Sequence, residues 1–299
     1  MMNENEPTQK KQVIYAKGLK GVIATETGLS DVRGEEGHLL YCGYEIEDLV
    51  DLCSFTEIIY LLLNKRLPNR EELEGLQQRL RNDRELPQPI LDFFKTATKT
   101  ARPMSALRTA VSMLGMYDDR TKDPSQMKEI GLSLIAKLPV MAAYYYRICQ
   151  GLDLPPIRND LGEAEHFLWL LKGTEPDPAE AHILDVAYIL HADHGMNAST
   201  FSARVTASTL SDMYSAITSA IGSLKGPLHG GANEAVIEML KEIGEEENVE
   251  EYINRKLANM RRFSASATAY TARSTRAPRF CAALPSALPR LSANLSGFA

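Results

Sequence analysis

Paired signals that start and stop helices divide the chain from about residue 45 to residue 258, and they constrain the fold more than any other sequence feature. Ser54 and Glu57 form a capping box before an apolar run, and Asn64 can end that helix in the left-handed conformation. Comparable helix starts recur at Asn69 with Glu72, Asp177 with Pro178, Asn233 before 234–243, and Asn248 with Glu251. Strand-like alternation is weak and is confined to 12–24 and 38–44. The sequence therefore predicts an all-α protein.

The longest predicted helix covers 127–150, ends at Gly151 and can bend at Pro139. Its three consecutive tyrosines, Tyr144, Tyr145 and Tyr146, are expected to pack against neighbouring helices and not to take part in chemistry. No internal repeat of 20–50 residues stands out, which argues against a solenoid.

The composition indicates a protein of the cytoplasm. No run of 18 apolar residues occurs among the 299 residues, so we expect no membrane helix and no membrane partner. Residues 1–12 are polar, lack the apolar segment of a signal peptide and are expected to be disordered. Four scattered cysteines without C-x-x-C spacing argue against a disulfide framework and against a cysteine-ligated zinc site.

The charge of the chain changes abruptly near residue 263. None of the 39 acidic residues and only four of the 33 basic ones lie in 263–299, which leaves a net charge of −10 for residues 1–262. An acidic body of this kind argues against nucleic acid as the main partner.

Two clusters of polar residues and glycines contain candidate site residues. In the first, at 191–199, His191 and His194 are three residues apart and can share a helix face. Two imidazoles and a carboxylate could bind a metal. Alternatively, the imidazoles, the Asn197 amide and the start of the following helix could bind an anion. The third possibility is a pair of satisfied histidines between helices.

The second cluster, at 226–233, places His229 between glycines just before a predicted helix. The helix dipole at that position disfavours an imidazolium ion, and a neutral imidazole could donate a hydrogen bond to a carbonyl oxygen that becomes enolate-like. The alternative is a glycine-rich turn with an incidental histidine.

Five segments together resemble citrate synthase, most closely its compact bacterial and archaeal form, which overlaps with 2-methylcitrate synthase. They are GLKGVIATET at 18–27, GHLLYCGY at 37–44, PMSALRT at 103–109, HADHGMNAST at 191–200 and GPLHGGANE at 226–234. The resemblance covers roughly 15–258 in order and spacing. It implies a homodimer with a large helical domain, here 13–224, and a small domain that begins at 225–262 and is incomplete in this sequence.

The same resemblance implies the activity and the site. The family condenses acetyl-CoA with oxaloacetate to give citrate and CoA, with no metal and no redox cofactor. His229 matches the histidine that stabilises the acetyl-CoA enol. His194 matches an oxaloacetate-binding histidine, with His191 and Asn197 in the same motif. This assignment favours the anion site over the metal site.

The sequence departs from the family pattern after about residue 260. A second catalytic histidine, the aspartate base and several carboxylate-binding arginines of the family are not found there. Read one base later, GGC-CAC-CGC codons for the family's Gly-His-Arg encode Ala-Thr-Ala, which stands at 267–269. We therefore expect 263–299 to be an out-of-frame tail and the 299-residue chain to be inactive. The alternatives are a genuinely divergent tail, a 2-methylcitrate synthase acting on propionyl-CoA, or a non-catalytic remnant.

Overall fold

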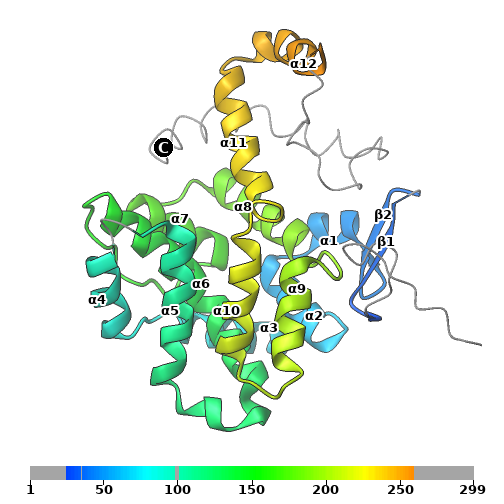
Figure 1. Ribbon diagram of the computed structural model, residues 1–299. Coiled ribbons are helices and arrows are strands. Elements are labelled where there is room, and N and C mark those ends of the chain that lie inside the picture. The colour runs from blue at the N-terminus through cyan, green and yellow to red at the C-terminus, as the bar shows by residue number, and fades with distance from the viewer. Residues whose placement is uncertain (1–24, 35, 98–100, 259–299) are drawn as a thin grey trace, which may run out of the picture.

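The computed structural model describes residues 25–34, 36–97 and 101–258 (Figure 1). The possible strand at 12–24, the disordered start expected at 1–12 and the expected out-of-frame tail lie outside these residues. Twelve α-helices lie in the described part, which confirms the all-α class. They are α1 (Ile46–Leu52), α2 (Phe55–Asn64), α3 (Arg70–Asn82), α4 (Gln88–Ala97), α5 (Pro103–Leu114), α6 (Met127–Cys149), α7 (Glu163–Lys172), α8 (Pro178–His191), α9 (Ala198–Ala207), α10 (Met213–Leu224), α11 (Gly231–Ile243) and α12 (Val249–Ala258).

Short 3₁₀ turns and one small sheet complete the described elements. The turns are η2 (Gly115–Tyr117), η3 (Asp119–Lys122), η4 (Pro124–Gln126) and η5 (Glu246–Asn248). The antiparallel sheet has the order β1 (Ser30–Arg33), β2 (His38–Tyr41), β3 (Tyr44–Glu45). The predicted strand at 38–44 is in fact two strands joined by a tight turn at Cys42 and Gly43, where both φ angles are positive. Strand β1 was not predicted.

The main core lies where α4, α5, α6 and α10 pack together. Phe94, Val111, Ile130 and Met141 are among its fully or almost fully buried members. The predicted packing role of the tyrosines holds for Tyr144 and Tyr145, which are buried and donate hydrogen bonds to backbone carbonyls. A second core joins β2 and α1 to α2 and α8, and it supports the loop that follows α8.

Most predicted helix starts are confirmed. The capping box at Ser54 and Glu57 is present, as is the box at Asn69 and Glu72. Asp177 accepts hydrogen bonds from the first turn of α8.

Two details of the helix ends were wrong. Asn64 is still helical, and Lys65 takes the left-handed conformation instead, with φ of 60°. Helix α11 begins at Gly231, before the expected cap Asn233, because the preceding turn already has helical backbone angles at Gly230.

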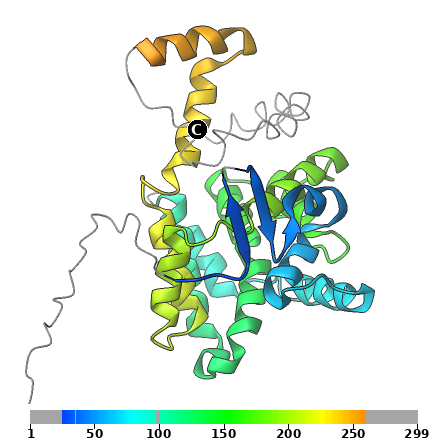
Figure 2. The ribbon, with the colours of Figure 1, turned by 90° about the vertical axis from the view of Figure 1, so that its right-hand side faces the viewer.

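Helices α11 and α12 form an arm (231–258) that stands clear of the remaining helices in both views (Figures 1 and 2). The arm follows α10 through the turn 225–230, which contains His229. In the part of the chain that the structure describes, no helix is long and apolar enough to cross a membrane.

Candidate active site

The first candidate segment is the loop 192–197 between α8 and α9. His191 is the last residue of α8; its Nδ1–H donates to the carbonyl oxygen of Ala187 at 2.7 Å. His194 lies in the loop and is exposed. Asn197 caps α9, because its Oδ1 accepts a hydrogen bond from the backbone N–H of Thr200 at 2.9 Å. The loop therefore ends at a helix N-terminus, which favours anions.

The second candidate segment is the turn 225–230. The N–H of His229 donates to the carbonyl of Gly226 at 2.9 Å, and the N–H of Gly230 donates to the carbonyl of Leu224 at 3.0 Å. A Cβ atom at Gly230 would lie 2.1 Å from the Leu224 carbonyl oxygen, so the backbone can approach this closely only at a glycine. The turn thus holds His229 just before the start of α11.

The structure brings the turn 225–230 to the start of α9, which follows the loop 192–197, through His229 and Ser199. The Nε2 atom of His229 lies 2.6 Å from the hydroxyl oxygen of Ser199, which belongs to the first turn of α9. The contact depends on the packing of α9 along α10 (Figure 1). The motif at 191–200 contains Ser199, but the sequence alone does not indicate its contact with His229.

The β2–β3 turn contains Cys42, whose thiol lies close enough to Asp193 of the loop to feel its charge. Burial raises the pKa of the Cys42 thiol, and the nearby Asp193 raises it further, whereas Lys65 lowers it. The thiol donates to the carbonyl of Leu61 at 3.7 Å. The thiol therefore stays protonated and adds no charge beside the loop.

Among the described residues, no group of three or more histidine, cysteine, aspartate or glutamate side chains is placed to hold a metal ion. The described site is thus built from imidazole, hydroxyl and amide groups together with two helix N-termini. Such groups bind carboxylates and donate hydrogen bonds to oxygens that gain negative charge.

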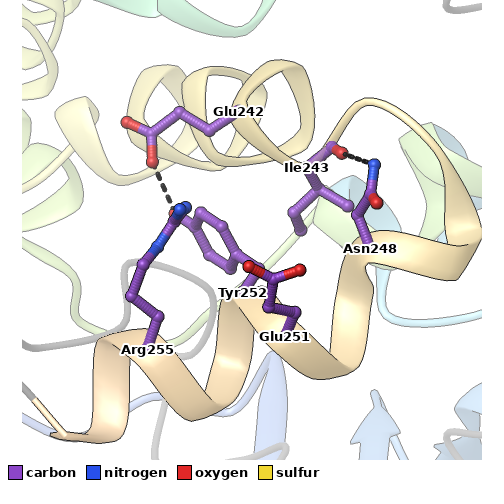
Figure 3. Close-up of a pocket in the computed structure, with 6 residues that line it drawn as sticks. All are labelled: Glu242, Ile243, Asn248, Glu251, Tyr252 and Arg255. Carbon is purple, nitrogen blue, oxygen red and sulfur yellow. Dashed lines mark hydrogen bonds between the residues drawn. The ribbon is translucent and has the colours of Figure 1, made fainter.

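A separate hollow of about 230 Å³ lies between α11 and α12 (Figure 3). Its lining groups pair with one another: Tyr252 donates to Glu242 at 2.8 Å, and Asn248 donates to the carbonyl of Ile243 at 3.0 Å. None of the predicted site residues lines it.

Comparisons with known proteins show which family the sequence and the fold resemble. Residues 18–277 match the family model described as citrate synthase, C-terminal domain. The chain is 50% identical over 244 residues to citrate synthase 2 of Bacillus subtilis (strain 168), and 42% identical over 250 residues to 2-methylcitrate synthase 2 of Corynebacterium glutamicum. Each alignment covers 81% of this chain, and the chain spans 65% of the length of each relative.

A solved structure supports the same relationship. The fold is similar to that of the citrate synthase of Thermoplasma acidophilum in its ternary complex with carboxymethyl coenzyme A and oxaloacetate, with a TM-score of 0.75 and 30% identity. That match covers 83% of this chain and 66% of the other. By its sequence and its fold, the chain belongs to the citrate synthase family.

Proposed function

We propose that this chain provides the oxaloacetate site and the enol-stabilising histidine of a citrate synthase, whose reaction joins acetyl-CoA to oxaloacetate. The observation that carries the proposal is the 2.6 Å contact between Ser199 and His229, which joins the two motifs at one place. Support comes from the similar archaeal enzyme, whose solved complex contains oxaloacetate and a coenzyme A analogue.

In this proposal, His229 acts on the thioester. We assign the Ser199 hydroxyl as the donor to Nε2, which leaves a proton on Nδ1 of His229. That N–H then donates to the thioester oxygen as the methyl group loses a proton and the oxygen becomes enolate-like. The enol carbon attacks the ketone carbon of oxaloacetate, and hydrolysis of the thioester of the product releases CoA.

Oxaloacetate carries two carboxylates, which need cationic or dipolar partners. We assign one of them to the loop 192–197, where His194 is exposed beside the N-terminus of α9. His191 and Asn197 help to build this loop through their contacts with Ala187 and Thr200. No metal and no further cofactor take part in the proposed chemistry.

Removing the proton from the thioester methyl group needs a carboxylate base. By resemblance this base belongs to a segment after residue 262, where the present sequence has no acidic residue. We therefore infer that the 299-residue polypeptide binds oxaloacetate but does not form citrate.

Titration calorimetry with oxaloacetate and an assay of CoA release test the proposal on the 299-residue chain. We expect measurable binding, no CoA release, and a roughly tenfold weaker affinity for His194→Asn, because a hydrogen bond to a carboxylate is lost. The matched control is His182→Asn, an exposed histidine on the same helix as His191. Equal affinities in both variants would contradict the assigned site, and ordinary turnover would contradict the predicted inactivity.

A second candidate is a 2-methylcitrate synthase, because a relative of that description is 42% identical. The binding of acetyl-CoA and of propionyl-CoA, each measured by calorimetry with oxaloacetate present, distinguishes the two. We favour acetyl-CoA because the 50% identical relative is a citrate synthase. As in the family, we propose that the chain forms a homodimer in the cytoplasm.

A further inference from the structure

Tyr41, the last residue of β2, is completely buried although it carries a hydroxyl group. Its ring belongs to the core that joins β2 to α1, α2 and α8 and includes Leu49, Ile58 and Ile189. A buried hydroxyl is costly unless it has hydrogen-bond partners. The partners of Tyr41 lie 149 and 152 residues further along the chain.

Those partners are the end of α8 and the loop that follows it. The Tyr41 hydroxyl oxygen lies 3.0 Å from the carbonyl oxygen of Asp193 and 3.4 Å from that of Leu190, and it donates toward both. The backbone N–H of Asp193 donates back to the hydroxyl at 3.3 Å. Carbonyls in the last turn of a helix lack partners within the helix. A single hydroxyl thus ties the end of α8 to the start of the loop 192–197.

The residue that follows Asp193 is His194. On its other side, Gly195 has a φ of 61°, and its N–H donates to the Asp193 carboxylate at 2.8 Å. Hydrogen bonds therefore hold the backbone both before and after His194. Those before His194, at the end of α8, are made by the Tyr41 hydroxyl. If Tyr41 only filled space in the core, phenylalanine would serve equally well.

We propose that Tyr41 is a positioning residue, whose hydroxyl holds the loop 192–197 in the form that presents His194 to a carboxylate ligand. The part of this statement that concerns the ligand rests on the proposed function. The part that concerns the loop can be tested without any ligand.

The test is Tyr41→Phe in the 299-residue chain, followed by amide hydrogen exchange. We expect exchange at the Asp193 and Gly195 amides to become roughly tenfold faster, because the hydrogen bond that closes the loop is lost. Amides of α2 should remain protected, which shows that the core is intact. The matched control is Tyr44→Phe, since Tyr44 pairs with Tyr41 across the hairpin but is 40% exposed. Unchanged exchange in Tyr41→Phe would overturn the proposal.

A second measurement is the affinity for oxaloacetate. We expect a roughly tenfold weaker affinity in Tyr41→Phe and an unchanged affinity in Tyr44→Phe. Faster exchange with unchanged affinity would overturn the role toward the ligand. If the unmutated chain does not bind oxaloacetate, the proposed function fails, whereas the exchange result still decides whether Tyr41 positions the loop.

Discussion

His166 on α7 shows how strongly burial acts on a single residue. Its side chain is almost completely inaccessible, and its Nε2 accepts a hydrogen bond from the backbone N–H of Arg158 at 3.4 Å. Burial, assisted by the charges of Arg84 and Arg158, lowers the pKa of His166 from 6.5 to about 3. The imidazole is thus neutral in the folded protein, in keeping with its acceptor role.

This shift predicts a loss of stability in acid. Below pH 6.5 the unfolded chain binds a proton at His166, whereas the folded chain does not bind it until about pH 3. The contribution of the neutral His166 to the free energy of unfolding is therefore complete above pH 6.5 and is lost as the pH falls toward 3. Between pH 6 and pH 5 we expect the free energy of unfolding to fall by roughly 1 kcal/mol from this residue.

Denaturant unfolding at pH 5, 6 and 7 measures this contribution. His166→Gln keeps a hydrogen-bond acceptor and should reduce the slope of stability against pH, whereas the exposed His182→Gln serves as the control. Identical slopes in the unmutated chain and in His166→Gln would show that His166 does not carry the effect.

The sequence predicts only part of the candidate site. The residues that it does not indicate, Ser199 and Tyr41, were not predictable for one physical reason. His194 and His229 belong to motifs that are read locally. Ser199 and Tyr41 act through hydrogen bonds to residues 30 and about 150 positions away. Such contacts arise from the packing of α9 on α10 and of β2 on α8, and no local sequence pattern indicates this packing.

At the scale of elements, the turn 225–230 requires a glycine at its end, whereas helix α3 contains a glycine that it does not require. A Cβ at Gly230 would collide with the Leu224 carbonyl oxygen, whereas a Cβ at the exposed Gly75 of α3 would meet nothing within 4 Å. We expect Gly230→Ala to lower the free energy of unfolding by about 2 kcal/mol. Gly75→Ala should raise it by about 0.5–1 kcal/mol, because alanine favours a helix.

Thermal unfolding of the two variants, compared with the unmutated chain, measures both effects. The same residue change in two places makes each variant the control of the other. A Gly230→Ala variant as stable as the unmutated chain would show that the turn can relax around a methyl group.

Helix starts were predictable because their signals are local. A side chain that caps the first turn is separated from its partner by three residues, as at Ser54 and Asn69. The ends were harder: Asn64 was expected to take the left-handed conformation that Lys65 adopts. Strand β1 was missed because its pairing with β2 is set by the fold, and most of its residues face solvent.

At the scale of the whole molecule, α9 is only half covered. None of its ten residues, all of which the structure describes, is buried, and Phe201 and Val205 are 39% and 51% exposed. Phe201 and Val205 are four residues apart, so they share one face of α9 and offer an apolar contact to another chain. This observation supports the proposed homodimer.

Light scattering on the purified chain tests that assembly. We expect a mass twice that of one chain, and a shift to the single-chain mass for Val205→Glu, because a charge would be buried in the contact. Leu52→Glu, on α1, introduces the same charge at another exposed apolar position and should leave the dimer intact. A single-chain mass for the unmutated protein would contradict the homodimer.

The arm formed by α11 and α12 has a practical consequence for anyone who handles this protein. It follows α10 through a turn in which the side chain of Leu228 is fully exposed. A protease that cleaves beside leucine can reach this bond without unfolding the helices on either side. Cleavage there would separate His229 from Ser199, so a trimmed preparation would keep most of its helices and lose the contact that joins the two motifs.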